Sequence, residues 1–338
     1  MNRTVLKSLG ALVFPLASLL FACSADQREV TVYTSLDQPL SQTVLEQFER
    51  DAGIRANAVY DTEATKTTGL VNRILAEANR PQCDVFWNNE NVQTLRLVSR
   101  GVTQPYVSPN AETIPASFRD PQGHWTGFAA RVRVIVVNTD RVDPVPAFAE
   151  YEDIFLDSHA ADSALALPLF GTTASHVAAL ATAWGVDETE TWLRSIQDRG
   201  AQILESNGRT CDAVARGAIS FAWTDSDDFA VAQSEGYPIA AVIPSSGAIL
   251  IPNTVSIIAG APHPDEAKAL VDYLLRPETE RLLAQQSGRQ IPLHPDVETP
   301  TDVFRLSDLR VQQIDWGAVA ENFEAATAMV NRVTSGGR

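Results

Sequence analysis

The sequence is short of basic residues, of cysteine and of histidine. Lysine and arginine number 26 against 42 aspartates and glutamates, which gives a formal net charge of −16. A chain this acidic repels nucleic-acid phosphates, so no nucleic-acid partner is expected. Low-complexity tracts, heptad repeats and collagen repeats are absent, which excludes the fibrous and disordered classes. What remains is a globular composition over 338 residues, 45% hydrophobic and 20% charged, long enough for two domains.

The motifs of common enzymes are also missing. The chain has no Gly-x-Ser-x-Gly nucleophile elbow, no His-Glu-x-x-His zinc motif and no Walker A loop. Its five histidines are scattered without metal-ligand spacing. The aspartate-rich segment 224–228 could hold a metal for phosphoester hydrolysis, but nothing supplies a second metal cluster. A metal-dependent hydrolase is therefore the remote alternative, and we predict a protein that is not an enzyme.

The N-terminal segment has the pattern of an export signal. Arg3 and Lys7 precede an apolar run over residues 9–22, which is too short to span a bilayer. The run ends in Ala22-Cys23, which resembles the bacterial lipobox. This resemblance implies that residues 1–22 are a cleaved signal peptide, that Cys23 carries a diacylglyceryl group, and that residues 23–29 form a lipid-anchored tether. An ordinary signal peptide followed by a chance cysteine is the alternative.

The remaining cysteines, Cys83 and Cys211, could form a disulfide in an exporting compartment. They lie far apart in the sequence and in different predicted domains, so we expect two buried free thiols. No later stretch is long and apolar enough for a transmembrane helix.

A β-α-β-α-β order opens the exported part of the chain. Strands are predicted at residues 30–34, 54–60 and 84–87, with helices between them, which indicates a parallel sheet with right-handed crossovers. Ligands gather at the carboxyl ends of such strands. Three polar segments lie at the ends of these strands, at residues 34–38, 61–63 and 87–90.

A long β-rich segment follows at residues 127–138. Arg131 and Arg133 are two residues apart in it and share one face of the strand. Two arginines on an apolar strand need a partner, which could be a carboxylate, a sheet edge or a bound anion. A salt bridge that braces a hinge and a contact with ligand both fit this pattern.

A second α/β block has strands at residues 165–169, 201–204 and 218–223. Gly-Thr-Thr at 171–173 leads from a strand into a helix, where backbone N–H groups and hydroxyls either bind an anion or simply cap the helix. The strand 218–223 opens onto the acidic segment 224–228. After strands at 239–243 and 248–251 comes a helix, and everything beyond Pro292 is predicted to be helical.

This order predicts two α/β lobes, the second inserted into the first. Lobe 1 comprises residues 30–137 and 247–338, the latter including the C-terminal helices, and lobe 2 comprises residues 138–246. Two strand connections between the lobes would form the hinge.

Several segments in this order resemble the periplasmic solute-binding proteins of ABC importers, in particular their ferric-iron-binding branch. They are Val-Tyr-Thr-Ser at 32–35, Asp-Val-Phe-Trp at 84–87, Gly-Phe-Ala-Ala-Arg at 127–131 and Ile-Pro-Asn-Thr at 251–254. The likeness covers roughly residues 30–295. It implies a type II-like periplasmic-binding-protein fold and a monomer that closes over its ligand. It also implies ABC permease and ATPase subunits as partners, and a location in the periplasm.

One departure from that branch concerns the cargo. Ferric-binding relatives commonly place two adjacent tyrosines after a strand like 218–223, whereas this chain has Thr-Asp-Ser-Asp-Asp there and no adjacent tyrosines anywhere. Carboxylates can bind iron(III), but phenolate is the stronger donor. The resemblance therefore implies iron as possible cargo through carboxylates, and no resident cofactor.

The residues expected in the cleft are those of the polar strand ends. The predicted ligand-binding set is Thr34, Asp37, Asp61, Glu63, Trp87, Asn89, Glu90, Arg131, Thr172, Thr173, Asp225, Asp227 and Asp228. The predicted metal ligands are Glu63, Glu90, Asp225 and Asp227, and Lys66 is a candidate counter-charge. Each acid could instead cap a helix or pair on the surface.

Three ligands fit this set in different degrees. Oxygen-only ligation suits a hard metal ion, ferric or divalent, alone or accompanied by an anion on the threonine helix end. A tryptophan face from Trp87 or Trp223 with carboxylates would suit an organic cation or zwitterion, such as an aminophosphonate or a polyamine. The excess of acid argues against a sugar phosphate.

Overall fold

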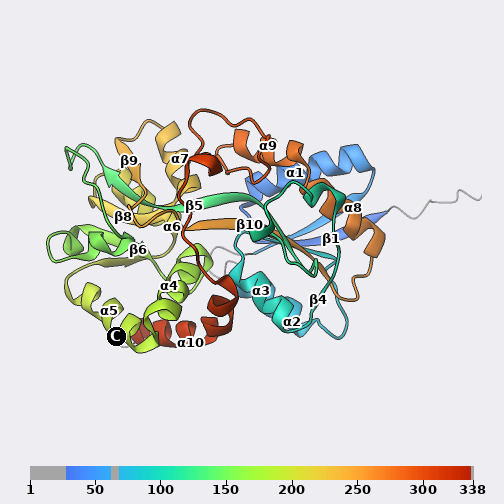
Figure 1. Ribbon diagram of the computed structural model, residues 1–338, viewed down its shortest axis with the longest axis horizontal. Coiled ribbons are helices and arrows are strands. Elements are labelled where there is room, and N and C mark those ends of the chain that lie inside the picture. The colour runs from blue at the N-terminus through green and yellow to red at the C-terminus, as the bar shows by residue number, and fades with distance from the viewer. Residues whose placement is uncertain (1–27, 62–67, 336–338) are drawn as a thin grey trace, which may run out of the picture.

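The computed structural model describes residues 28–61 and 68–335. The ten strands of this described part form one continuous sheet, with the main order β2-β1-β3-β10-β5-β8-β6-β7. The sheet divides into two halves with helices around each, and β5 belongs to both halves (Figure 1). This arrangement confirms the predicted two-lobed α/β fold.

Lobe 1 is built on a parallel core of three short strands. β1 (Glu29–Thr34) lies between β2 (Arg55–Tyr60) and β3 (Val85–Asn88), and pairs in parallel with both. The connections are α1 (Gln38–Ala52) and α2 (Thr68–Ala76), and α3 (Val92–Ser99) follows β3. Pro39 and the left-handed Gly53 mark the two ends of α1, as its sequence predicts. The carboxyl ends of these strands face lobe 2.

The hinge is formed by the two longest strands. β5 (Thr126–Asn138) is buried along its whole length, pairing with β10 in its first half and with β8 and β9 in its second. β10 (Leu250–Ile258) leads back into lobe 1 and also pairs with β3 and β4 (Thr103–Gln104). The register shifts between Pro252 and Asn253, which lets a proline sit inside this central strand.

Lobe 2 repeats the parallel pattern with shorter strands. β6 (Ser163–Ala166) pairs in parallel with β7 (Gln202–Leu204) and β8 (Phe221–Asp225). β9 (Ile239–Val242) pairs antiparallel with β5. The helices are α4 (Gly171–Trp184), α5 (Val186–Asp198), α6 (Asn207–Ala215) and α7 (Ser226–Ser234). Cys83 and Cys211 are free and buried, which confirms the prediction of free thiols.

The C-terminal part differs from the prediction in two ways. After α8 (Pro264–Leu274) and α9 (Pro277–Gln285), the chain from residue 286 to 315 is mainly irregular rather than helical. The last helix, α10 (Trp316–Ser335), packs on α4 and α5 of lobe 2 as well as on α3 of lobe 1, so the whole C-terminus does not complete lobe 1. Its apolar face joins the Trp223 core of lobe 2, because Phe323 and Met329 are buried there.

A third crossing between the lobes was not predicted. The segment leading to α10 forms a parallel bridge between Ala248 and Val311, and the N–H of Ala248 donates to the carbonyl of Arg310 at 2.8 Å. In Figure 1 this segment crosses in front of β5 and β10 on its way to α10. Within residues 28–61 and 68–335, no helix is long and apolar enough to cross a membrane.

Candidate functional site

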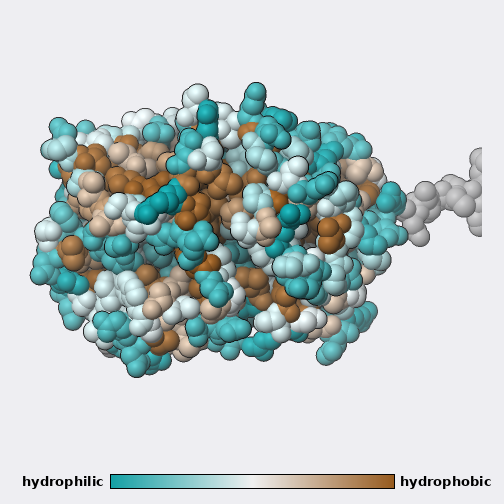
Figure 2. Space-filling model, in the orientation of Figure 1, coloured by the Kyte–Doolittle hydropathy of each residue, from teal (hydrophilic) through white to brown (hydrophobic). Residues whose placement is uncertain are grey.

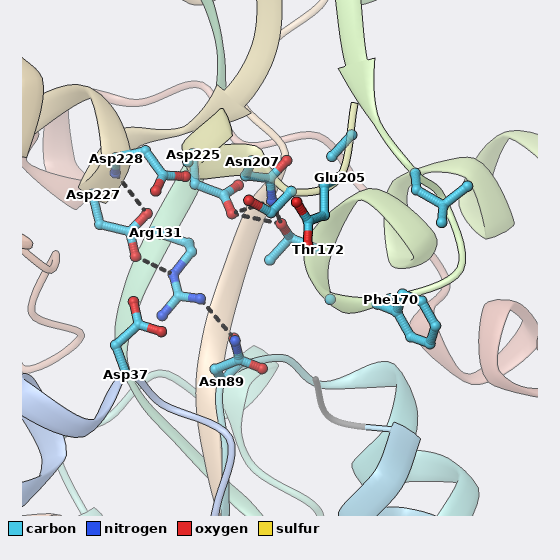
Figure 3. Close-up of a pocket in the computed structure, with 15 residues that line it drawn as sticks. Asp37, Asn89, Arg131, Phe170, Thr172, Glu205, Asn207, Asp225, Asp227 and Asp228 are labelled. Carbon is cyan, nitrogen blue, oxygen red and sulfur yellow. Dashed lines mark hydrogen bonds and ion pairs between the residues drawn. The ribbon is translucent and has the colours of Figure 1, made fainter. Parts of the chain in front are cut away.

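A polar cavity of about 250 Å³ lies between the two lobes, at the carboxyl ends of their strands. Lobe 1 contributes Asp37 and Asn89, the hinge strand β5 contributes Arg131, and lobe 2 supplies the remaining lining (Figure 3). The polar residues from lobe 2 are Thr172, Glu205, Ser206, Asn207, Asp225, Asp227 and Asp228.

Three aspartates of lobe 2 form the densest cluster of charge in this cavity. Asp225 ends β8, and Asp227 and Asp228 lie in the first turn of α7. One carboxylate oxygen from each lies within 4.8 Å of one from the others. The strand-to-helix turn brings them together, and the N-terminal end of the helix dipole favours negative charge there. Such a cluster offers anionic oxygen to a hard cation.

Arg133 forms a buried ion pair with Asp225, the first of these aspartates. The antiparallel register places Arg133 of β5 directly opposite Asp225 of β8. Its Nη1 donates to Asp225 Oδ1 at 2.7 Å, and the guanidinium is fully buried. It also donates to the hydroxyls of Thr172 and Thr173, at 3.0 and 3.2 Å. Arg133 is therefore a buried brace behind the cavity wall, which is one of the two roles open from the sequence.

Arg131 lies on the same strand face but at the cavity itself. Its Nε is 3.1 Å from Asp227 Oδ2 in lobe 2, and its Nη1 donates to the backbone carbonyl of Asn89 in lobe 1 at 3.1 Å (Figure 3). Burial lowers the pKa of Arg131, but the nearby carboxylates of Asp227, Asp225, Asp37 and Asp228 raise it above its ordinary value. Arg131 is thus a fixed positive charge that bridges the lobes.

The charge balance of the site is negative. Five carboxylates of the described lining face the cavity, from Asp37, Glu205, Asp225, Asp227 and Asp228, against the guanidinium of Arg131 and that of Arg133 behind it. The formal sum is −3. The described part of the cavity lining offers oxygen donors and no sulfur or imidazole, so it suits a hard cation or an ammonium group rather than a soft metal.

The structure brings seven of the predicted residues to this cavity. They are Asp37, Asn89, Arg131, Thr172, Asp225, Asp227 and Asp228. Thr173 lies directly behind, where its hydroxyl donates to Asn207 Oδ1 at 2.7 Å. Thr34 is fully buried at the end of β1, and its hydroxyl accepts from the N–H of Leu36 rather than lining the cavity.

Glu90 is not placed as a metal ligand of the cavity. Its carboxylate accepts from the N–H groups of Val92 and Gln93, so it caps α3, and from the hydroxyl of Ser175 on α4 at 2.9 Å. Burial raises the pKa of Glu90, against the opposing effect of these hydrogen bonds. Helix capping is the alternative that the sequence left open for each predicted acid, and it is the role that Glu90 has here. Glu90 instead joins lobe 1 to lobe 2 beside the cavity.

The prediction that a tryptophan ring faces the ligand is wrong, because both tryptophans are buried. Trp87 is fully buried against Phe128, with ring centroids 5.6 Å apart, and does not line the cavity. Trp223 is equally buried and stacks on His176 at 4.3 Å. Both rings follow the buried face of their strands, so neither face is open to a ligand cation.

Asp61 also has a local role, because its carboxylate accepts from the N–H of Leu70 in α2 at 3.2 Å. Glu63, Lys66 and Cys23 lie outside the residues that the structure describes.

Several residues of the lining were not predicted from the sequence, among them Phe170, Glu205 and Asn207. Asn207 is central, because its amide donates to Thr172 Oγ1 at 2.8 Å and to Asp225 Oδ2 at 3.1 Å. A signal for two of them was available. Glu205 and Asn207 follow the end of β7, and that polar strand end obeys the same rule as the three segments that were singled out in lobe 1.

A polar cavity between two α/β lobes that share long hinge strands defines a ligand-binding protein of the two-lobed type. The chain belongs to the family of bacterial extracellular solute-binding proteins, whose model matches residues 84–322. Members of this family are the non-enzymatic, ligand-capturing components of ABC uptake transporters, which confirms the predicted class and the prediction that the protein is not an enzyme.

Named relatives extend over most of the chain. The iron uptake protein A2 of Synechocystis sp. is 26% identical over 310 residues, covering 86% of this chain and 84% of its own. The major ferric iron-binding protein of Neisseria meningitidis serogroup A is 22% identical over 332 residues, covering 94% and 96%.

Solved structures agree on the fold. The apo ferric ion-binding protein A of Pasteurella haemolytica superposes with a TM-score of 0.80 at 23% identity, over 91% of this chain and 98% of that one. The periplasmic binding protein AfuA of Actinobacillus pleuropneumoniae, with fructose-6-phosphate bound, gives 0.78 at 22% identity, over 91% and 98%. Proteins with different ligands thus share this architecture, and the cargo must be argued from the site.

Proposed function

We propose that this protein captures ferric ion in the cleft between its lobes and delivers it to the permease of an ABC importer. The observation that carries the proposal is the cluster of Asp225, Asp227 and Asp228, whose oxygens lie within 4.8 Å of one another in the cleft. Asp37 of lobe 1 lines the same cavity. The iron uptake and ferric iron-binding names of the relatives support this choice of cargo.

The donor set is consistent with a hard trivalent cation. Carboxylate oxygen is anionic and hard, and a formal charge of −3 around the cavity matches one ferric ion. A cavity of about 250 Å³ has room for more than one bare ion. The N-terminal end of α4 reaches the cavity through Gly171 and Thr172, where an accompanying anion would meet the positive end of the helix dipole.

Transport would follow from closure of the lobes on the hinge. A cation held by Asp37 from one side and the aspartate cluster from the other binds the closed state more tightly, and this difference in affinity shifts the protein toward it. The permease would then recognise the closed state. As a further part of the proposal, residues 1–22 direct export and are removed, and a lipid on Cys23 keeps a monomeric protein at the membrane facing the periplasm.

The second candidate is an organic cation or zwitterion, such as a polyamine or an aminophosphonate. Two observations favour it: Asp225 and Asp227 are already ion-paired with arginines, and Phe170 brings an aromatic ring to the cavity lining. Trp87 and Trp223 give it no support, because both rings are buried. An ammonium group would then lie among the carboxylates, and a phosphonate at the α4 end.

A titration of the purified protein from residue 24 onward tests the two candidates. Isothermal titration calorimetry and melting temperature would be recorded with ferric citrate, citrate alone, spermidine and 2-aminoethylphosphonate. The informative variants are Asp228→Asn and Asp37→Asn, which keep the side-chain shape and remove one oxygen anion from each lobe. The matched control is Asp157→Asn, an exposed carboxylate of lobe 2 that does not line the cavity.

We expect saturable stabilisation by ferric citrate but not by citrate. Each cleft variant should weaken ferric binding by at least about 10–100-fold, the loss typical when even an outer-shell partner of a metal ligand is removed. Asp157→Asn should bind as the unaltered protein does. Saturable binding of spermidine or the phosphonate, with no ferric response, would replace iron by the organic candidate and leave the transport role in place.

A further inference from the structure

A buried hydrogen bond joins the two lobes beside the cleft. Ser175 of α4 in lobe 2 donates its hydroxyl proton to Glu90 Oε2 of lobe 1 at 2.9 Å. Each of the two residues is 1% exposed. Ser175 lies one turn after Gly171, which lines the cleft at the start of α4. α3 and α4 lie on the two sides of the boundary between the lobes (Figure 1), so the bond depends on how the lobes are placed.

Groups of lobe 1 and the hinge hold the Glu90 carboxylate in position. Its oxygens accept from the side-chain amide of Asn88 and from the N–H groups of Gln93 and Val92, at 2.9, 2.9 and 2.7 Å. The backbone carbonyl of Glu90 accepts from the hydroxyl of Thr254 in β10 at 3.1 Å. A carboxylate that accepts from all these donors is ionised. It would keep its position when lobe 2 moves away.

Ser175 has a second acceptor within its own helix. Its hydroxyl is 3.5 Å from the carbonyl oxygen of Gly171, against 2.9 Å from Glu90 Oε2. A serine in a helix commonly donates to the carbonyl four residues before it. Separation of the lobes would therefore leave the hydroxyl with an acceptor and open the carboxylate to water. The bond can break and re-form without leaving a buried polar group unsatisfied, which would be costly.

A chain of hydrogen bonds connects this contact to the cleft. Asn88, which donates to Glu90, accepts from the hydroxyl of Ser35 at 2.7 Å. The oxygen of that hydroxyl accepts from the N–H of Asn89 at 2.9 Å. Asn89 lines the cleft, and its carbonyl accepts from Arg131. The end of β3 thus carries both a cleft residue and the contact between the lobes.

We propose that Glu90 and Ser175 form a latch that stabilises the closed arrangement of the lobes, with or without cargo. The proposal rests on lobe closure, as the proposed function does, but not on the identity of the cargo. Movement on the hinge would carry Ser175 away from Glu90, so the open state lacks this bond. A hydrogen bond to a charged group favours the closed state by about tenfold. Glu90 is a positioning residue, since it does not belong to the described lining of the cleft.

The burial of the latch predicts how it responds to salt. Glu324 of α10 also pairs across the lobes, but its side chain is 64% exposed. Figure 2 shows many hydrophilic residues along this lower edge of the molecule, over α10 and α3. Salt screens exposed pairs and screens buried contacts much less. The contribution of the latch to closure should therefore be the same at low and at high salt.

The test measures the separation of the lobes in the purified protein, without cargo and with ferric citrate. Spin labels are attached at Glu46→Cys in α1 and Glu235→Cys at the end of α7, which are both exposed positions. The native cysteines, Cys83 and Cys211, are buried. Double electron–electron resonance then gives the distribution of distances between the labels, and from it the ratio of closed to open protein.

Two variants address the two sides of the latch. Ser175→Ala removes the donor, and Glu90→Gln keeps the shape of the acceptor and removes its charge. The matched control is Thr182→Ala on the same helix, because the hydroxyl of Thr182 donates to the carbonyl of Ala178 within α4 at 2.8 Å. Ser175→Ala leaves the lobe 1 bonds of Glu90 in place, so it remains informative if Glu90→Gln does not fold.

We expect Ser175→Ala to lower the ratio of closed to open protein about tenfold, equally without cargo and with ferric citrate, and equally at low and high salt. Ferric citrate should dissociate about tenfold faster in stopped-flow measurements, with association unchanged, because cargo enters and leaves the open form. Glu90→Gln should act in the same direction. Adding Ser175→Ala to Glu90→Gln should cause little further loss, because the two residues share one bond.

Three results would each overturn the latch. They are a ratio in Ser175→Ala within about twofold of the parent, an equal fall in Thr182→Ala, and a parent with no closed population in either condition. An effect of Ser175→Ala that disappears at high salt would contradict it as well. If ferric citrate does not bind, the proposed cargo is wrong, and the distances in the cargo-free protein still decide the latch.

Discussion

The buried ion pair between Arg133 and Asp225 should be a main determinant of the stability of lobe 2. Asp225 accepts from Arg133 Nη1 at 2.7 Å, from the hydroxyl of Thr172 at 2.5 Å and from the amide of Asn207 at 3.1 Å. The Arg133 guanidinium is fully buried, and the Asp225 side chain is 5% exposed. Asp225→Asn keeps the shape and removes the charge, so Arg133 would remain buried without its counter-ion.

The expected loss of stability is large because both members of the pair are buried. Removing one member of a buried pair typically costs about 3–5 kcal/mol, since the other charge stays desolvated. At about 2 °C per kcal/mol for a chain of this size, the melting temperature should fall by about 6–10 °C. The control is Asp162→Asn, which breaks the exposed Arg141–Asp162 pair at 2.9 Å. A surface pair contributes about 0–1 kcal/mol, so this variant should melt within about 2 °C of the parent.

The assay is calorimetric melting without any cargo. It compares the parent, the control, the single variants Asp225→Asn and Arg133→Met, and the double variant that carries both of these changes. When both charges of the pair are removed, neither residue is left as a buried charge without a counter-ion. The double variant should therefore be more stable than Asp225→Asn alone. A fall of under about 2 °C for Asp225→Asn would refute the reasoning. The reasoning would also be refuted if the melting temperature of the double variant fell by the sum of the two single-variant decreases, because the two charges would then act independently.

Three further predictions follow from other contacts. Burial raises the pKa of Glu152 to about 7, above the pKa of a glutamate in the unfolded chain. Folding therefore binds a proton at Glu152, and the stability of the protein should fall as the pH rises toward 7. Glu152→Gln should accordingly raise the melting temperature at pH 8 but not at pH 4. Glu324 of α10 forms ion pairs with Arg96 and Arg100 at the end of α3 in lobe 1, at 2.9 and 2.7 Å. Glu324→Gln should weaken cargo binding, measured by calorimetry, a few-fold at low salt and not at high salt, because salt screens exposed ion pairs. Burial raises the thiol pKa of Cys83 and Cys211, so a thiol reagent should label neither in the native protein and both after denaturation; rapid native labelling would contradict this.

The sequence predicted those parts of the fold and site that depend on local order along the chain. Strand ends in an alternating β/α pattern are brought to one edge by the topology, so the order of the elements was enough to place Asp37, Asn89, Asp225 and Asp227 in the cleft. The two-residue spacing of Arg131 and Arg133 likewise predicted a shared strand face.

What could not be predicted depends on which neighbour each side chain meets. Nothing local distinguishes Glu90, which caps α3 and bonds Ser175, from a carboxylate that faces a ligand. Trp87 is a strand residue whose two faces are both covered, which becomes known only when β10 and Phe128 are in place. The irregular segment 286–315 is held by distant pairing at Ala248, a contact that no periodicity reveals.

The position of the last helix has a practical consequence. The first described strand, β1 from Glu29, lies in lobe 1, whereas α10 packs mainly on lobe 2 and ends at Ser335. The two ends of the folded chain therefore belong to different lobes and emerge on opposite sides of the molecule (Figure 1). A fluorescent donor placed near one end and an acceptor near the other would report each opening and closing as a change in energy transfer. The protein could thus serve as its own sensor, with no label inserted into the cleft or the hinge.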